Sequence, residues 1–357
     1  MLWEEAQVDF SVRRFPADGR AGNCLYLRHS FSTAPMPLVD LPLRELYSYA
    51  GLNPCPPDLD AYWDESLREM EAADPAIELR PAAFRSPHAE CFDLFFTGVG
   101  GSRVHAKYLR PKQGNGKGPA VLQFHGYAGS AGDWQDKLAY VNGLGCAVAA
   151  LDCRGQGGGS QDLGGVSGTT LRGHIIRGLD DPDPRKLAFR QIFLDTAMLA
   201  KIVAGFDEVD AGRIGAMGGS QGGALTLACA ALAPHLIQRA APVFPFLSDY
   251  QRVWEMDLAE NAYDELKYYF RNFDPRHERE REVFTRLGYV DIQHLAKRIR
   301  GEVLMATGLM DRICPPSSQF AAYNKISAKK RVVIYPDFGH EGLPGFLDRT
   351  FEFMAGL

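Results

Sequence analysis

The stretch RIGAMGGSQGGALTLACAALA, residues 213–233, joins an apolar run typical of a strand, a glycine-rich turn and a helix-like run. At its centre, Gly218-Gly219-Ser220-Gln221-Gly222 matches the pattern G-x-S-x-G. In that pattern the serine lies in a strained turn, and the positions two before and two after it lack side chains because strand and helix pass closely. The stretch therefore predicts a nucleophile elbow, with Ser220 as nucleophile and Gly218 and Gly222 supporting the turn.

The letters GGSQ also occur at residues 158–161, but there the surroundings differ. Asp162 replaces the second glycine, and no helix-like run follows. We therefore expect Ser160 to be a loop residue that hydrogen-bonds to nearby backbone. Neither a G-K-[ST] sequence nor a G-x-G-x-x-G after the first strand is present, so no phosphate or dinucleotide site is expected.

Short apolar runs and helical patterns alternate around this stretch. Strands are predicted at 91–96, 103–109, 120–124, 145–152, 213–218, 240–244, 302–307 and 331–335, and helices at 59–70, 186–205, 223–233 and 317–326. The first two strands are expected to form an antiparallel hairpin, and the later ones are continuous apolar runs typical of parallel strands covered on both faces. Asp58 is a possible cap of the first helix. The pattern predicts an α/β fold with a mostly parallel sheet.

Residues 36–357 are expected to form this single domain. Residues 1–35 form a leader that could be an arm packed on the surface or an upstream extension of the reading frame, and the absence of any motif favours the extension. A helix-rich excursion is predicted at 245–300, where apolar residues recur at helical spacing and indicate a packing face. These residues are Leu258, Ala262, Leu266, Tyr269 and Phe273.

Two later strands are each followed by a polar residue that could act with Ser220. The strand at 302–307 leads to Asp311, and the strand at 331–335 leads to His340. The chain order serine, aspartate, histidine is the one that this architecture uses. We predict that His340 is the general base and acid and that Asp311 orients it. Asp337 is too close to His340 along the loop to serve as the acid.

An oxyanion hole requires backbone N–H groups. One is expected from Gln221, the residue after the nucleophile, and the other from Tyr127, in the loop after the strand at 120–124. His125 in the same loop is interpreted as a structural histidine.

The composition excludes several classes of function. A formal charge of −5 and a pI near 6.0 disfavour nucleic acid and polybasic membrane contact. Apolar runs are too short to span a bilayer, and the first residues lack a secretory h-region. The seven cysteines lack CxxC spacing, which favours reduced, buried thiols in a cytoplasmic protein, and no HExxH helix occurs. No metal and no cofactor are expected.

Several motifs together resemble the cephalosporin C deacetylase / acetyl xylan esterase family, carbohydrate esterase family seven. Three signatures stand in the family's order: Arg154-Gly155-Gln156, the Ser220 pentapeptide and His340-Glu341. The runs GHIIRGLDD (173–181), GLMDRICPP (308–316) and FAAYNKI (320–326) are also family-like. The resemblance covers residues 36–357.

The resemblance implies an α/β-hydrolase fold with an eight-stranded sheet. It implies a serine esterase that removes acetyl groups from acetylated sugars, including xylo-oligosaccharides, and from small esters such as cephalosporin C, through an acyl-enzyme. It also implies that Arg154 and Gln156 support the active site, and that 157–183 is an interface loop in a cytoplasmic homohexamer built as a ring of dimers. Residues 187–190, Leu-Ala-Phe-Arg, depart from the paired tyrosines usual in the family.

Two alternatives stay open. The chain could be another α/β hydrolase, such as a peptidase or a dienelactone-type hydrolase, which the Ser-Gln pair and the upstream Arg-Gly-Gln disfavour. It could also be a non-catalytic binding protein on the same fold. Such proteins usually lack a member of the triad, whereas Ser220, Asp311 and His340 are all present.

Overall fold

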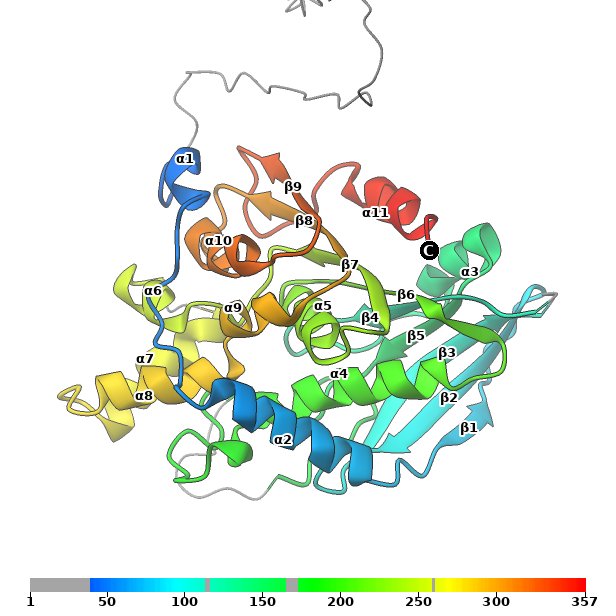
Figure 1. Ribbon diagram of the computed structural model, residues 1–357, viewed down its shortest axis with the longest axis horizontal. Coiled ribbons are helices and arrows are strands. Elements are labelled where there is room, and N and C mark those ends of the chain that lie inside the picture. Colours follow the sequence, from blue (N-terminus) through cyan, green and yellow to red (C-terminus); the bar gives the residue numbers. More distant parts are fainter. Residues whose placement is uncertain (1–38, 113–115, 165–172, 259–260) are drawn as a thin grey trace, which may run out of the picture. The chain divides into compact units, whose positions relative to one another are not determined.

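Nine strands form one sheet in the order β1-β2-β3-β5-β4-β6-β7-β8-β9 (Figure 1). The computed structural model describes residues 39–112, 116–164, 173–258 and 261–357. The strands are β1 (Glu78–Pro81), β2 (Ala89–Thr97), β3 (Arg103–Pro111), β4 (Gly118–Phe124), β5 (Ala147–Leu151), β6 (Val209–Gly219), β7 (Ile237–Val243), β8 (Glu302–Gly308) and β9 (Lys330–Tyr335). The leader predicted at 1–35 and residues 165–172 of the predicted interface loop lie outside the described residues.

All eight predicted strands are present, and the α/β-hydrolase fold is confirmed. The predicted hairpin is the antiparallel pair β2 and β3, and neighbours from β5 through β9 run parallel. The sheet has one strand more than the resemblance implies, because β1 pairs antiparallel with β2 at the edge. This four-residue strand is half-exposed to exposed and carries no apolar alternation, so no sequence pattern marks it.

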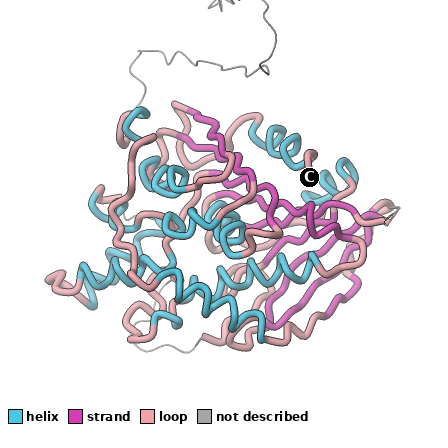
Figure 2. Tube along the Cα trace, viewed as in Figure 1, coloured by secondary structure: helices cyan, strands magenta, loops and turns pink. Residues whose placement is uncertain are grey.

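Helices cover both faces of the sheet (Figures 1 and 2). They are α1 (Leu43–Leu46), α2 (Leu59–Ala72), α3 (Leu138–Leu144), α4 (Ala188–Ala204), α5 (Gln221–Leu232), α6 (Tyr250–Glu255), α7 (Asp264–Phe273), α8 (Glu280–Leu287), α9 (Ile292–Leu295), α10 (Pro316–Lys325) and α11 (Phe346–Met354). On β4, Ala120 and Leu122 belong to the core cluster that contains α4 and α5, whereas Val121 belongs to the cluster that contains residues of α3 and α11. Two covered faces explain why the central strands are largely apolar on both sides.

The four predicted helices correspond to α2, α4, α5 and α10. Asp58 occupies the cap position of α2, but the prediction that it caps the helix is wrong. Its side chain makes no cap hydrogen bond and instead accepts one from the Tyr289 hydroxyl at 2.6 Å. Asp58 has φ −101° and ψ 12°, not the extended conformation usual at a cap, and Tyr289 lies 231 positions away in the sequence.

The predicted excursion at 245–300 contains α6 to α9. Its apolar repeat is confirmed as a packing face: Leu258, Leu266 and Tyr269 lie in the core, and Ala262 and Phe273 pack against it. None of the helices in the described part of the chain is long and apolar enough to cross a membrane.

Candidate active site

Ser220 lies in the sharp turn between β6 and α5. Its backbone has φ +58° and ψ −120°, a strained conformation for a residue with a side chain. Neighbouring segments hold it there, because the Ser220 N–H donates to Val243 O at 3.0 Å and the Ser220 carbonyl accepts from Phe246 N at 3.1 Å. The predicted nucleophile elbow is therefore present.

Gly218 and Gly222 are required by close approach of backbones. A Cβ at Gly218 would overlap both the Phe124 carbonyl oxygen and the Gly222 backbone. A Cβ at Gly222 would overlap the Phe124 carbonyl oxygen even more severely. The turn therefore packs closely against the end of β4, and the ends of β6 and α5 also approach each other closely.

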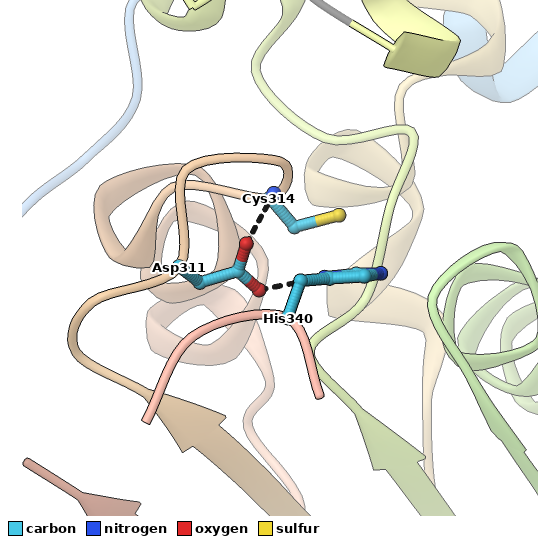
Figure 3. Close-up of side chains that lie close together, drawn as sticks. All are labelled: Asp311, Cys314 and His340. Atoms are coloured by element: carbon cyan, nitrogen blue, oxygen red, sulfur yellow. Dashed lines mark hydrogen bonds and ion pairs between the residues drawn. The ribbon is translucent and has the colours of Figure 1, made fainter. Parts of the chain in front are cut away.

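Asp311 and His340 meet at the carboxyl ends of β8 and β9 (Figure 3). His340 Nδ1 lies 2.8 Å from Asp311 Oδ2, and the Asp311 side chain is fully buried. Its other oxygen accepts the N–H groups of Ile313 and Cys314, both at 2.8 Å. A carboxylate fixed in this way holds Nδ1 protonated and leaves Nε2 free to take a proton.

The ring of His340 is also held from its face. Phe244 packs on it with ring centroids 4.3 Å apart. Phe244 itself has φ +32° and follows β7 directly. The imidazole is thus positioned by one hydrogen bond and one aromatic contact.

Cys314 is a site residue that the sequence pattern does not single out. Atoms of Asp311, Cys314 and His340 lie within 4.8 Å of one another, and Figure 3 shows the sulfur beside the imidazole. Burial and the Asp311 charge raise the pKa of the Cys314 thiol well above its usual value, while a hydrogen bond with the Ser220 side chain acts in the opposite direction. The Ser220 side chain therefore lies next to Cys314, whereas the described residues show no hydrogen bond between Ser220 and His340.

The same three side chains could offer donor atoms to a metal ion. His340 Nδ1 and Asp311 Oδ2 are engaged with each other. A metal at this point would have to displace the contact that orients His340. The geometry favours acid–base chemistry over metal binding.

Gln156 joins the two segments that carry the predicted oxyanion donors, the loop that contains Tyr127 and the start of α5. Gln221 is the first residue of α5, so its N–H has no partner within the helix. Ala128, which follows Tyr127, donates its N–H to Gln156 Oε1 at 2.9 Å, and the side chains of Gln156 and Gln221 bond to each other. This places Gln156 between the Tyr127 loop and the start of α5, as an active-site support would be.

Within the described part of the chain, Arg154 makes no hydrogen bond with Ser220, Asp311 or His340. It forms two hydrogen bonds with Asp195 of α4, at 2.6 and 2.7 Å, and donates to Val99 O at 2.8 Å. Arg154 is 5% exposed and Asp195 is 1% exposed. The ion pair fixes the start of the Arg-Gly-Gln loop, so any support from Arg154 is indirect.

His125 and Ser160 have the structural roles that the sequence predicts. His125 Nε2 accepts the Cys153 N–H at 3.0 Å, and its Nδ1 donates to the Gly126 carbonyl at 2.7 Å. Ser160 donates to Asp152 O at 2.6 Å and accepts from His105 N at 2.8 Å. The GGSQ at residues 158–161 is therefore part of a loop that Ser160 fastens to the backbone of β3 and of the segment after β5.

The departure at 187–190 lies inside the chain's own core. Leu187 and Phe189 are buried in the cluster that contains α4 and α5. The Arg190 guanidinium is buried and bonds to Ser66 Oγ at 3.0 Å and to Glu69, both on α2. These residues attach α4 to α2.

A cavity of about 560 Å³ borders the site from the side of α11. Its lining includes Gly218 and Gly219 before Ser220, Phe244, and Glu341 and Gly342 after His340. Ser220 and His340 themselves do not line it. It therefore adjoins the reacting groups without containing them.

Comparisons with known proteins agree with this geometry. Residues 36–357 match the family described as acetyl xylan esterase (AXE1). Acetyl esterase Axe7A from Xylanibacter ruminicola is 25% identical over 288 residues, which are 79% of this chain. The chain spans 62% of the length of that relative.

Two solved structures are similar over most of the chain. Acetyl xylan esterase 1 from Thermoanaerobacterium sp. JW/SL YS485 is 58% identical with a TM-score of 0.87, covering 89% of this chain and 99% of that one. Acetyl xylan esterase from Paenibacillus sp. R4 is 34% identical with a TM-score of 0.84, covering 88% and 99%. An acylaminoacyl peptidase from Pyrococcus horikoshii, 17% identical with a TM-score of 0.51 over 75% of this chain and 40% of that one, shares the fold alone.

Proposed function

Because this chain belongs to the acetyl xylan esterase family of carboxylic ester hydrolases, we propose that it is a serine esterase that removes acetyl groups from acetylated sugars such as xylo-oligosaccharides. The observation that carries the proposal is the 2.8 Å contact of His340 with Asp311, beside a serine in a nucleophile elbow. A non-catalytic protein would have no need to maintain the strained Ser220 backbone next to an oriented imidazole.

The mechanism follows from the positions of these groups. His340 Nε2 takes the Ser220 proton as the serine oxygen attacks the acetyl carbonyl, and the imidazolium is stabilised by Asp311. The N–H groups of Tyr127 and Gln221 bind the oxyanion, and each is expected to contribute about 100- to 1000-fold in rate. The imidazolium of His340 then gives its proton to the leaving sugar oxygen as the carbon–oxygen bond breaks, and the sugar departs with a free hydroxyl. Water, activated by the same histidine, releases acetate from Ser220.

We further propose that small acetyl esters, including cephalosporin C, are substrates and that the protein is a cytoplasmic homohexamer. Family resemblance supports these proposals. Light scattering on the full chain tests the assembly, and a monomer would contradict it. Acetate release from cephalosporin C tests the substrate.

The activity itself is tested with p-nitrophenyl esters of increasing chain length and with acetylated xylo-oligosaccharides. We expect fast hydrolysis of acetate and little of decanoate. Ser220→Ala should abolish acetate release, while Ser160→Ala, the matched change in the other GGSQ, should retain it. Persistent acetate release by the Ser220 variant would contradict the proposal.

A further inference from the structure

The carboxylate of Glu265 joins three segments that are far apart in the sequence. Glu265 lies on α7 in the helical excursion and is 6% exposed. Its Oε1 accepts the Tyr127 hydroxyl and, at 3.3 Å, the His174 N–H. Its Oε2 accepts the N–H groups of Ile175 at 2.8 Å and Ile176 at 3.2 Å. One side chain therefore joins the helical excursion, the loop that contains Tyr127, and residues 174–176, which follow the Arg-Gly-Gln loop.

The local sequence is adapted to this contact. A Cβ at Gly173 would overlap the Glu265 carboxylate, and Gly173 also has φ +51°. Burial raises the pKa of Glu265, while its partners, all of them donors, favour the charged form. A buried carboxylate costs free energy unless it is hydrogen-bonded, so each donor is needed.

The phenol of Tyr127 is enclosed by this network. Its hydroxyl donates to Glu265 and accepts the His174 N–H at 2.9 Å. The ring packs edge-on against His174, with centroids 6.0 Å apart, and against Phe246 at 5.8 Å. The side chain of Tyr127 is thus held in one orientation from several sides.

The backbone of the same turn is held separately. Ala128 has φ +59°, and its N–H is bound by Gln156. A strained turn keeps its geometry only if its surroundings determine it. The Gln156 side chain holds the main chain directly after Tyr127, by accepting the Ala128 N–H. Glu265 holds the same turn through the Tyr127 side chain.

We infer that Glu265 is a positioning residue that, through the Tyr127 hydroxyl, holds the Tyr127 N–H at the oxyanion site. The inference rests on the proposed function, in which that N–H binds the developing oxyanion. Donors must be placed where the oxyanion forms, so a small displacement weakens transition-state binding more than substrate binding. It also makes catalysis depend on the docking of the excursion at 245–300, since α7 carries the carboxylate.

Glu265→Gln tests the inference on the full-length protein. The glutamine amide has nearly the same shape as the carboxylate, but its NH2 group faces hydrogen-bond donors, either the Tyr127 hydroxyl or the N–H groups of residues 174–176. One of these two groups must therefore move. We expect kcat for p-nitrophenyl acetate to fall roughly 10- to 100-fold, up to the value of one lost donor. KM should stay within about threefold, because ground-state binding does not use the oxyanion.

A second measurement isolates the oxyanion. Trifluoroacetone, a ketone that adds to the serine and places an oxyanion in the hole, should lose affinity by the same factor as kcat. Tyr127→Phe should show the same pattern, and the double variant should be no worse than the poorer single variant, because both changes break one link.

Asp274→Asn is the matched control. Asp274 is a buried carboxylate of the same excursion that accepts the N–H groups of Glu278 and Arg279 and does not contact Tyr127. It should lower thermal stability and leave kcat and trifluoroacetone affinity unchanged.

Several outcomes would overturn the inference. The inference fails if Glu265→Gln keeps the wild-type kcat or changes KM alone. It also fails if the losses in kcat add up in the double variant, or if Asp274→Asn loses as much kcat as Glu265→Gln. If Glu265→Gln does not fold, Tyr127→Phe decides by the same kcat and inhibitor readouts. Residual activity in Ser220→Ala would instead contradict the proposed function, so the two failures are distinguishable.

Discussion

Gln156 and Gln221 exchange hydrogen bonds between their side-chain amides, although 65 positions separate them. Gln156 Nε2 donates to Gln221 Oε1 at 2.8 Å, and Gln221 Nε2 donates to Gln156 Oε1 at 3.0 Å. Gln156 Oε1 also accepts the Ala128 N–H. One amide thus links the Arg-Gly-Gln motif, the nucleophile elbow and the turn that contains Tyr127.

Gln156→Ala should therefore disturb the oxyanion site without removing a reacting group. We expect kcat for p-nitrophenyl acetate to fall roughly tenfold, less than the loss of a whole oxyanion donor. Gln161→Ala is the control, because Gln161 lies in the same loop and its side chain accepts the Arg103 N–H, its one side-chain hydrogen bond among the described residues. Equal activity of the two variants would argue against the link.

Asp311→Asn should reduce kcat by about 10⁴-fold, because an amide cannot hold His340 in the productive tautomer. The side-chain oxygen can still accept the Ile313 and Cys314 N–H groups, so the fold should persist. Asp337→Asn, which alters the exposed rival carboxylate, should leave kcat near the wild-type value. Steady-state kinetics and circular dichroism check both, and a large loss in Asp337→Asn would reverse the assignment.

His105 predicts a pH dependence of stability. Burial lowers its pKa, but the hydrogen bonds and charges of Asp152 and Asp93 outweigh this and raise the pKa above the ordinary value. A folded pKa above the unfolded one means that the stabilisation is complete below about pH 6.5 and is lost as the pH rises through the folded pKa. Urea unfolding should show the free energy of unfolding falling over that range.

His105→Gln should remove this part of the pH dependence. The difference in unfolding free energy between wild type and variant should shrink as the pH rises, whereas His88→Gln, at an exposed histidine, should follow the wild-type curve. A difference that is constant from pH 5 to 9 would show that His105 does not titrate between the two carboxylates.

Arg154→Met should destabilise the protein, because it leaves the Asp195 carboxylate buried without its partner. The expected loss is about 3–5 kcal/mol in the free energy of unfolding. Arg185→Met removes an exposed ion pair with Asp183 and should change stability little. Denaturant titration measures both, and similar small losses would mean that Arg154 contributes chiefly its alkyl chain.

Much of the active site could be predicted from local sequence. A strand followed by G-x-S-x-G and a helix identifies Ser220, because that turn requires small residues within two positions of the serine. Asp311 and His340 follow strands whose apolar character is evident, and parallel strands bring their carboxyl ends to one edge. Short-range patterns and sheet topology were sufficient to place these three residues at one edge of the sheet, and their catalytic roles stay predictions.

The remaining features depend on contacts that no local pattern encodes. Cys314 resembles the other buried thiols until the turn after β8 brings it beside His340 and Ser220. Glu265 lies in what the sequence marks only as an amphipathic helix. β1, a short and half-exposed strand, is defined by its pairing with β2.

The sequence by itself predicted the chemistry, with Ser220 as the candidate nucleophile and Asp311 and His340 as its candidate partners, because this prediction depends on residue type at the ends of strands. Only the tertiary structure decided how that chemistry is held in place. Glu265 meets Tyr127 across 138 positions, and Gln156 meets Gln221 across 65. Hydrogen bonds between such distant residues form only after the core has packed, so their partners cannot be identified from spacing.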